Sequence, residues 1–138
     1  MNEKEIPLPP FTIETATERV RLSVIAWNTK KTGDVCKMCT SDIEWHDRTE
    51  FIRGLEEVDR FLKSKWEKEL DCRLKLELWG FRNNRMAVRS ACEWCDAAGQ
   101  WYRTYGNELW EFESNGLLKK RFATANDMLI MESECEIL

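Results

Sequence analysis

The sequence contains one histidine and no long apolar run, and each scarcity argues against a class of protein. His46 has no second histidine to join it as a metal ligand, and a cysteine–histidine catalytic pair would depend on this one residue. No apolar stretch approaches the roughly 18 residues that a membrane-spanning helix requires. Residues 1–10 are polar and then proline-rich, without the hydrophobic core of a signal peptide. We therefore predict a cytoplasmic protein that does not enter a membrane.

A basic surface and the common nucleotide motifs are also missing. The net charge is −4 and the sequence pI is about 5.2, whereas nucleic acids and anionic membranes bind basic patches. The sequence has no G-x-G-x-x-G, P-loop or G-x-S-x-G motif, so nucleotide binding and serine hydrolysis have no support. We expect no cofactor and no nucleic-acid partner.

The composition predicts one globular domain. The 138 residues are 43% hydrophobic and 33% charged, which is ordinary for a water-soluble domain. A chain of this length can bury about two-thirds of its unfolded surface. We expect a single domain over residues 1–138, with loose tails at 1–10 and 132–138.

The six cysteines include two C-x-x-C pairs, a spacing that is common in zinc sites. They are Cys36, Cys39, Cys72, Cys92, Cys95 and Cys135. The first pair lies in a helical pattern and the second in a strand, where residues three apart point to opposite faces and cannot hold one ion. We therefore expect no metal, no disulfide and six free thiols in a reducing compartment.

The order of predicted elements indicates an α+β fold. Apolar residues at helical spacing follow a plausible N-cap at Thr12, a short helix follows Thr32, and a third helix begins after Gly54. Apolar and polar residues alternate over 42–53, which predicts two short strands around a loop at His46-Asp47-Arg48. The same alternation over 72–127, interrupted by turns, predicts four long antiparallel strands. Three helices in the N-terminal half would then pack on a curved, mostly antiparallel sheet.

The most informative segment runs from Trp101 to Asp127 and is typical of a β-hairpin with a Ser-Asn-Gly turn. Glu108 shares one face of its first strand with aromatic residues, and a carboxylate there must be paired, protonated or exposed to a cavity. If Phe112 pairs with Leu117, Glu108 lies opposite Arg121. Ala123 and Ala125 follow Arg121 on this face, and such small side chains leave room for a pocket.

Other interpretations of this sheet remain open. The pair of Glu108 and Arg121 could be a structural ion pair without chemistry. The opposite face carries Glu93, Arg103 and Tyr105, which we interpret as a surface or dimer-contact network. If the two faces are exchanged, these residues form the site, in a row with Asp127.

Seven tryptophans are many for this length, and they predict either a thick aromatic core or the wall of an apolar pocket. The candidate pocket-lining residues are Trp27, Trp45, Phe61, Trp66, Trp79, Val88, Ser90, Cys92, Trp94, Thr104, Trp110, Ala123 and Ala125.

From Pro7 to Ile130 the sequence resembles the SnoaL-like family of the nuclear-transport-factor-two-like superfamily. The resemblance rests on Leu8–Thr12, Ala26–Thr29, Arg48–Gly54, Lys65-Trp66, Glu77–Trp79, Asn84–Arg89 and Tyr105–Phe112. It implies one SnoaL-like domain with a cone-shaped fold, a homodimer, and a pocket between the sheet and the helices. Some members of this superfamily are enzymes and others are binding or assembly domains, so the fold alone does not assign a function.

The superfamily includes ketosteroid isomerase, and part of this sequence is similar to it. The spacing from Glu108 through Phe112 to Gly116 resembles the strand that carries the pocket acid of the isomerase, and Asp47 falls near its general base. No tyrosine matches the oxyanion tyrosine, because the corresponding segment reads Ile25-Ala26-Trp27. This departure argues against enolate chemistry on a steroid-like ketone.

Two functions follow from these observations. The first is a cofactor-independent general acid–base enzyme, an isomerase, cyclase or hydratase, with Asp47 as base and Glu108 as acid or orienting group beside Arg121. The second is a non-catalytic binder or dimerisation module. In both, the expected ligand is a small apolar or amphipathic molecule.

Overall fold

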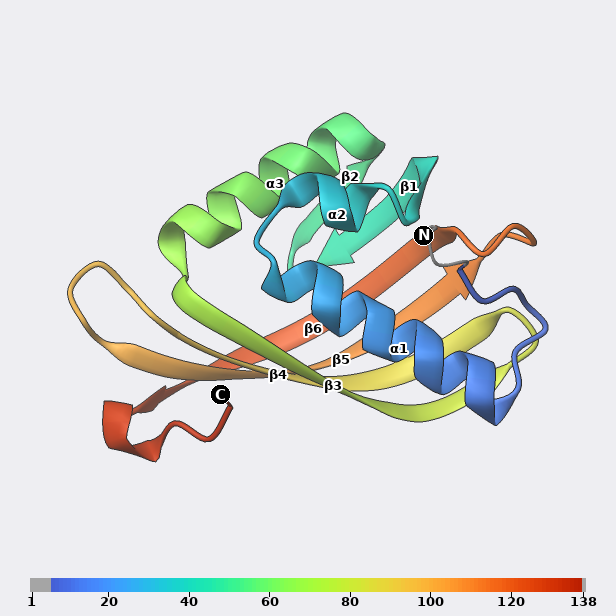
Figure 1. Cartoon of the computed structure of the whole chain (residues 1–138). Helices are drawn as coiled ribbons and strands as arrows, with labels where there is room; N and C mark the ends of the chain where they lie inside the picture. Colours follow the sequence, from blue (N-terminus) through green and yellow to red (C-terminus); the bar gives the residue numbers. More distant parts are fainter. Residues whose placement is uncertain (1–5, 138) are drawn as a thin grey trace.

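The computed structural model describes residues 6–137, which form helices on one side of a single six-stranded sheet (Figure 1). The helices are α1 (Ile13–Asn28), α2 (Thr32–Cys36) and α3 (Leu55–Lys68). The strands are β1 (Cys39–Asp47), β2 (Glu50–Arg53), β3 (Leu70–Arg82), β4 (Arg85–Cys95), β5 (Trp101–Phe112) and β6 (Leu118–Ile130). A 3₁₀ helix, η1 (Glu132–Glu134), follows β6. The predicted α+β class and the four long strands are confirmed.

The sheet has the strand order β2-β1-β6-β5-β4-β3. All neighbouring strands are antiparallel except β1 and β6, which are parallel and are separated along the chain by α3 and four strands. Figure 1 shows the long strands curving beneath α1, with α2 and α3 beside β1 and β2. This arrangement places the last residue of β1 next to the middle of β6.

Local chemistry explains where α1 begins and ends. Thr15 N–H donates to Thr12 Oγ1 at 3.1 Å, and Thr12 N–H donates to Thr15 Oγ1 at 2.8 Å, so the predicted cap is present. At the other end, the Asn28 amide bonds both the carbonyl and the N–H of Leu74, which attaches the helix to β3. The buried face between these ends, with Ala16 and Val20, joins the hydrophobic core over the sheet.

The third helix follows the predicted pattern. Gly54 precedes it with φ of 94°, a backbone conformation that glycine adopts without steric cost. Glu56 and Glu57 lie in the first turn, where the helix dipole favours negative charge. Val58 and Leu62 are fully buried and fix the helix against the sheet. Among residues 6–137, none of the helices has the length and apolar character of a membrane span.

The segment after β6, expected as a loose tail, is attached to the outer face of the sheet, the face away from the helices. Buried Glu93 accepts hydrogen bonds from the backbone N–H groups of Glu136 at 2.9 Å and Ile137 at 2.7 Å. Arg103 Nε donates to Glu93 at 2.8 Å, and Arg103 Nη2 donates to the Glu134 carbonyl. Burial raises the pKa of Glu93, but these donors outweigh it and hold the pKa below the ordinary 4.5.

We expect Glu93→Gln to release residues 134–137 from the sheet, because an amide cannot accept from Arg103 and two backbone donors equally well. Hydrogen exchange at the amides of Glu136 and Ile137 should accelerate at least tenfold, since a hydrogen bond to a charged group contributes about 1.5–3 kcal/mol. Because the folded pKa of Glu93 is lowered, its stabilisation is complete above pH 4.5 and is lost as the pH falls through the folded value. Unchanged exchange in the variant would contradict this role.

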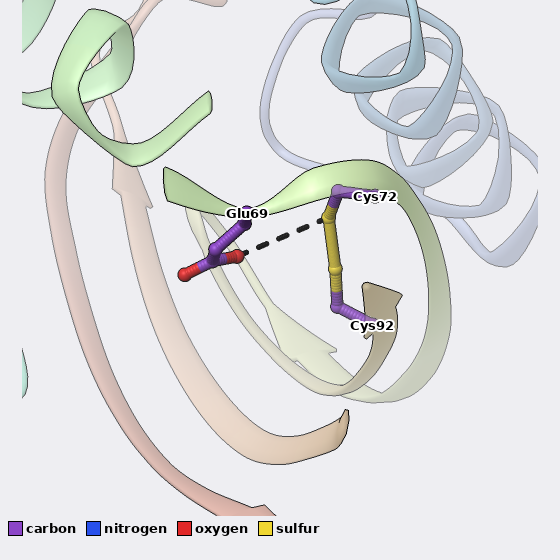
Figure 2. A group of neighbouring side chains, drawn as sticks. All are labelled: Glu69, Cys72 and Cys92. Atoms are coloured by element: carbon purple, nitrogen blue, oxygen red, sulfur yellow. Dashed lines mark hydrogen bonds between the residues drawn. A yellow bond between two sulfur atoms is a disulfide. The ribbon is translucent and has the colours of Figure 1, made fainter. Parts of the chain in front are cut away.

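The expectation of six free thiols is wrong for two of them. Cys72 on β3 and Cys92 on β4 form a disulfide, with their Cα atoms 6.4 Å apart (Figure 2). Strand pairing brings the two together, because Cys92 lies opposite Leu74, and Cys72 is two residues before Leu74 on the same face of β3. Glu69 lies beside them and makes the one potential metal-ligand cluster found among residues 6–137. Because these two sulfurs are bonded to each other, the cysteines no longer support the predicted reducing compartment.

A thiol titration tests this disulfide directly. We expect four reactive thiols per denatured chain without reductant and six after reduction. The double variant Cys72→Ser/Cys92→Ser should lower the free energy of unfolding by about 3 kcal/mol, the chain-entropy value for closing a loop of about 20 residues. Cys36→Ser is the matched control, because this cysteine is free and half-buried. Six reactive thiols without reductant would refute the bond.

Candidate functional site

Glu108 on β5 and Arg121 on β6 form a bidentate ion pair on the inner face of the sheet, toward the helices. Arg121 Nε donates to Glu108 Oε1 at 3.0 Å and Arg121 Nη2 donates to Oε2 at 3.1 Å. Trp110 Nε1 donates to the same Oε1 at 2.9 Å. Both charged side chains are buried, so each depends on the other for solvation.

The register that produces this pair differs from the predicted one. Glu108 lies opposite Ala123, and Arg121 lies opposite Trp110, so the ion pair runs diagonally across two strands. One residue of the difference arises at the turn, because Phe112 pairs with Leu118 instead of Leu117. The second arises at a bulge, because the neighbouring Glu111 pairs with Lys120. A shift of two residues preserves which side chains share a face, and the charge pair therefore survives.

Asp47 completes the cluster from the other side of Arg121. It is the last residue of β1, where the parallel pairing with β6 places Asp47 beside Ala123 and Trp45 beside Arg121. Arg121 Nη1 donates to Asp47 Oδ2 at 3.1 Å. No residue among 6–137 hydrogen-bonds to the second oxygen, Oδ1, so it is free to accept a proton or a hydrogen bond.

Aromatic rings enclose the guanidinium of Arg121. Its Cζ lies 4.3 Å from the centre of the Trp45 ring and 5.2 Å from that of Trp27, which is cation–π distance. Burial lowers the pKa of Arg121, but the charges and hydrogen bonds of Glu108 and Asp47 outweigh it and raise the pKa above its ordinary value. Arg121 is therefore a fixed cation.

The cluster lines a cavity between the sheet and the ends of α1 and α3, which we call the Asp47 cavity. Its volume is about 50 Å³, well below the 300–1,000 Å³ that is usual for pockets that hold drug-sized ligands. Of the predicted residues, those that line it are Trp27, Asp47, Trp66, Ser90, Cys92, Thr104, Glu108, Arg121, Ala123 and Ala125. It contains more polar groups than the apolar, aromatic-walled pocket predicted from the sequence.

The other predicted pocket residues lie elsewhere. Trp45, Val88 and Trp110 are buried in the core, and Phe61 packs against it. Trp94 is buried in a smaller cluster, where its indole N–H donates to Thr104 Oγ1 at 2.8 Å. Trp79 is 65% exposed, because it follows Leu78 on β3 and strand alternation places it on the outer face.

The alternative site on the outer face is not supported by the geometry. Glu93 and Arg103 bind the C-terminal segment, while Asp127 lies on the inner face and accepts from Thr104 Oγ1 and Arg48 Nη2, both at 2.7 Å. The row of Glu93, Arg103 and Asp127 therefore does not exist, since the two faces separate its members.

Several groups that line the Asp47 cavity are not predicted from the sequence. They are Asn28, Lys30, Lys65, Cys72, Leu74 and Thr124. Lys30 has φ of 61° and follows the end of α1, a position that helical periodicity does not predict. Burial and the charge of Arg73 lower the pKa of Lys30, against the raising effect of Asp71. Its ammonium group is therefore a better proton donor than that of an ordinary lysine.

Comparisons with known structures identify the fold. AclR, a putative hydroxylase from Streptomyces galilaeus, is similar with a TM-score of 0.71 and 15% identity, covering 83% of this chain and 81% of AclR. The epoxide hydrolase/cyclase-like enzyme SalBIII, described in pyran ring formation in the polyether salinomycin, is similar with a TM-score of 0.70 and 12% identity. The match covers 82% of this chain and 92% of SalBIII. An NTF2-like protein of unknown function from Burkholderia pseudomallei is similar with a TM-score of 0.69 and 18% identity, and the match covers 80% of this chain and 88% of that protein.

These similarities show that the chain has the NTF2-like fold, as the sequence resemblance implied. At these identities they establish the fold and not the reaction. A comparison with curated proteins finds no match. One family model matches residues 9–138, almost the whole chain, and the protein therefore belongs to the family described as "Protein of unknown function (DUF1348)".

Proposed function

We propose that the protein is a cofactor-independent enzyme that adds water, or a hydroxyl group of the substrate itself, to a small strained electrophile such as an epoxide. The arrangement of Asp47, Arg121 and Glu108 is the observation that carries this proposal. Arg121 is fixed by Glu108 on one side and holds one oxygen of Asp47 on the other, so that Asp47 Oδ1 remains available at the cavity. Such an oxygen can serve as a general base.

The chemistry assigns a role to each residue. A water molecule in the Asp47 cavity transfers a proton to Asp47 Oδ1 while its oxygen attacks a ring carbon and the ring C–O bond breaks. The ring oxygen gains a proton from Lys30, which solvent reprotonates, and Asp47 returns its proton to solvent. The net change is addition of one water to one epoxide. Glu108 accepts three hydrogen bonds and is a positioning residue rather than an acid.

Two similarities support this choice of chemistry over isomerisation. The similar protein SalBIII is described as epoxide hydrolase/cyclase-like, and AclR as a putative hydroxylase. Both descriptions name reactions that form a carbon–oxygen bond, as the proposed addition of water does.

A panel of small epoxides with the purified protein tests the proposal. We expect at least one to be converted to a diol faster than in buffer, with one oxygen of the product labelled when the reaction is run in ¹⁸O-water. Substrates of few heavy atoms should react best, since the cavity is about 50 Å³. If no member of the panel is converted above the buffer rate, the proposal is wrong.

The small volume of the Asp47 cavity favours a second candidate, a non-catalytic binder. In that case Glu108, Arg121 and Asp47 hold the sheet together, and a ligand enters only when Trp27 and Trp66 move apart. Binding of a small amphipathic molecule without product formation, and equal in the wild type and Asp47→Asn, would identify this function. We keep the cytoplasmic placement of either candidate as a prediction.

We further propose a homodimer through the outer face of the sheet. This face exposes large apolar side chains, among them Trp79 at 65%, Leu109 at 57% and Met128 at 43%. Exposed apolar groups gathered on one face are typical of an interface between copies. Light scattering at micromolar concentration should give twice the chain mass of 16.4 kDa. Leu109→Glu should shift the mass to that of one chain, and a wild type that is monomeric would exclude the dimer.

A further inference from the structure

Arg19 is a buried charged residue that, unlike Glu108 and Arg121, has no charged partner among residues 6–137. Arg19 of α1 is 1% exposed, and its Nη1 donates to Ser23 Oγ four residues along the helix. Its Cζ lies 5.0 Å from the centre of the Phe112 ring. Among residues 6–137, Arg19 forms no ion pair, and its Nε has no hydrogen-bond acceptor.

An unpaired buried charge is costly, so this position requires an explanation. Transfer of an ion from water into a protein interior costs several kcal/mol unless a counter-charge and hydrogen bonds replace the lost solvation. Burial lowers the pKa of Arg19 to about 10, against the raising effect of the Cys39 thiol. The guanidinium therefore keeps its charge at neutral pH, and no acidic side chain of residues 6–137 compensates it.

A small internal cavity lies against this cation. Its volume is about 20 Å³, and its wall includes Arg19, Ser23, Trp45 and Arg121. We call it the Arg19 cavity. The indole N–H of Trp45 is fully buried and also has no acceptor. A space of this size holds one water molecule or one small ion.

The chemistry of the wall favours an anion over water. The two unsatisfied groups, Arg19 Nε and Trp45 Nε1, are both donors, while Val35, Met38 and Leu118 make other parts of the wall apolar. A water molecule could accept from both donors but would find few acceptors for its own protons. A monatomic anion accepts from both and also neutralises the charge of Arg19.

We propose that the Arg19 cavity is a binding site for one small monovalent anion of the size of chloride, held by Arg19 Nε and Trp45 Nε1. Arg121 does not need this anion, because Glu108 and Asp47 already neutralise it. Trp27 and Arg121 line both cavities and lie between them. The proposed anion ligands Arg19 and Trp45 do not line the Asp47 cavity, so the anion site can be tested without reference to the proposed epoxide chemistry.

Thermal unfolding in sodium chloride and in sodium gluconate at equal ionic strength tests the site. Gluconate is too large for a 20 Å³ cavity, and it provides the same screening of surface charges. We expect the Tm of the wild type to be about 5 °C higher in chloride, the shift for an anion at tenfold its dissociation constant in a domain of this size. Equal Tm values in the two salts would overturn the proposal.

Variants show whether the effect arises in this cavity. Arg19→Met replaces the cation with an unbranched apolar side chain and should abolish the chloride effect, while its Tm in gluconate should equal or exceed that of the wild type. Arg21→Met is the matched control, because Arg21 lies on the same helix but on the surface, and it should keep the full effect. An unchanged chloride effect in Arg19→Met would assign the ion to another place.

A second pair of measurements remains decisive if Arg19→Met does not fold. Trp45→Phe removes the indole N–H donor while keeping an aromatic ring, although a smaller one, and should reduce the chloride effect by at least half. Crystals grown in sodium bromide should show an anomalous peak between Arg19 and Trp45. Density without an anomalous signal would identify a water molecule and refute the anion site.

Discussion

We expect Asp47→Asn to lower the turnover of the epoxide identified in the panel by about 10²–10⁴-fold, the usual contribution of a general base. The amide cannot take a proton from the attacking water. Its carbonyl oxygen can still accept from Arg121 Nη1, which now contacts Asp47 Oδ2 at 3.1 Å. Glu108 continues to hold Arg121 with two hydrogen bonds, so the variant should remain folded and lose about 1 kcal/mol of stability.

The effect on kcat should exceed that on KM, because the lost interaction acts in the transition state. Asp42→Asn is the matched control: it lies on the same strand, removes the same charge, and is exposed outside the cavity. Its turnover should equal that of the wild type. If Asp47→Asn keeps full turnover and a native circular dichroism spectrum, Asp47 is not the base, and the binding function becomes the better account.

The sequence predicted the parts of the site that depend on strand alternation. A carboxylate among aromatic residues must be neutralised, and the period of two along a strand restricted the partner to the inner face of the adjacent strand. Glu108 and Arg121 were found in this way even though the register was displaced by two residues. An error of one residue would have moved Arg121 to the outer face.

The features that the sequence did not predict depend on contacts between distant segments. The attachment of residues 134–137 to Glu93 joins positions more than 40 apart, and no local pattern marks it. The disulfide requires Cys72 and Cys92 to be adjacent across β3 and β4, whereas the sequence pattern drew attention only to the two C-x-x-C pairs, as possible zinc ligands. Arg19 lies on a predicted helix, but its burial without an acidic partner from residues 6–137 is visible only in three dimensions.

We expect Glu108→Gln to lower the free energy of unfolding by about 3–5 kcal/mol, the usual cost of removing one partner from a buried ion pair. The glutamine carbonyl can accept from Arg121 Nε and Trp110 Nε1, but its NH₂ group then faces Arg121 Nη2, and two donors oppose each other. Asp47 alone remains to neutralise Arg121. Chemical denaturation at neutral pH measures this loss directly.

Glu111→Gln is the matched control for this measurement. It is the same substitution on the same strand, but Glu111 pairs with the exposed Arg85 at 2.9 Å, and such pairs contribute about 0–1 kcal/mol. A difference of less than 1 kcal/mol between the two variants would show that water solvates the pair of Glu108 and Arg121 in solution.

A double-mutant cycle separates the ion pair from general damage to the core. Arg121→Gln alone leaves Glu108 and Asp47 together without their common cation, so it should destabilise at least as much as Glu108→Gln. In the double variant the two amides can hydrogen-bond to each other, and its loss should be smaller than the sum of the single losses by about 0.5–3 kcal/mol. Additive losses would mean that each side chain contributes only its own packing. The cluster would then not be rigid enough to position Asp47, and the proposed catalytic role of Asp47 would lose its structural basis.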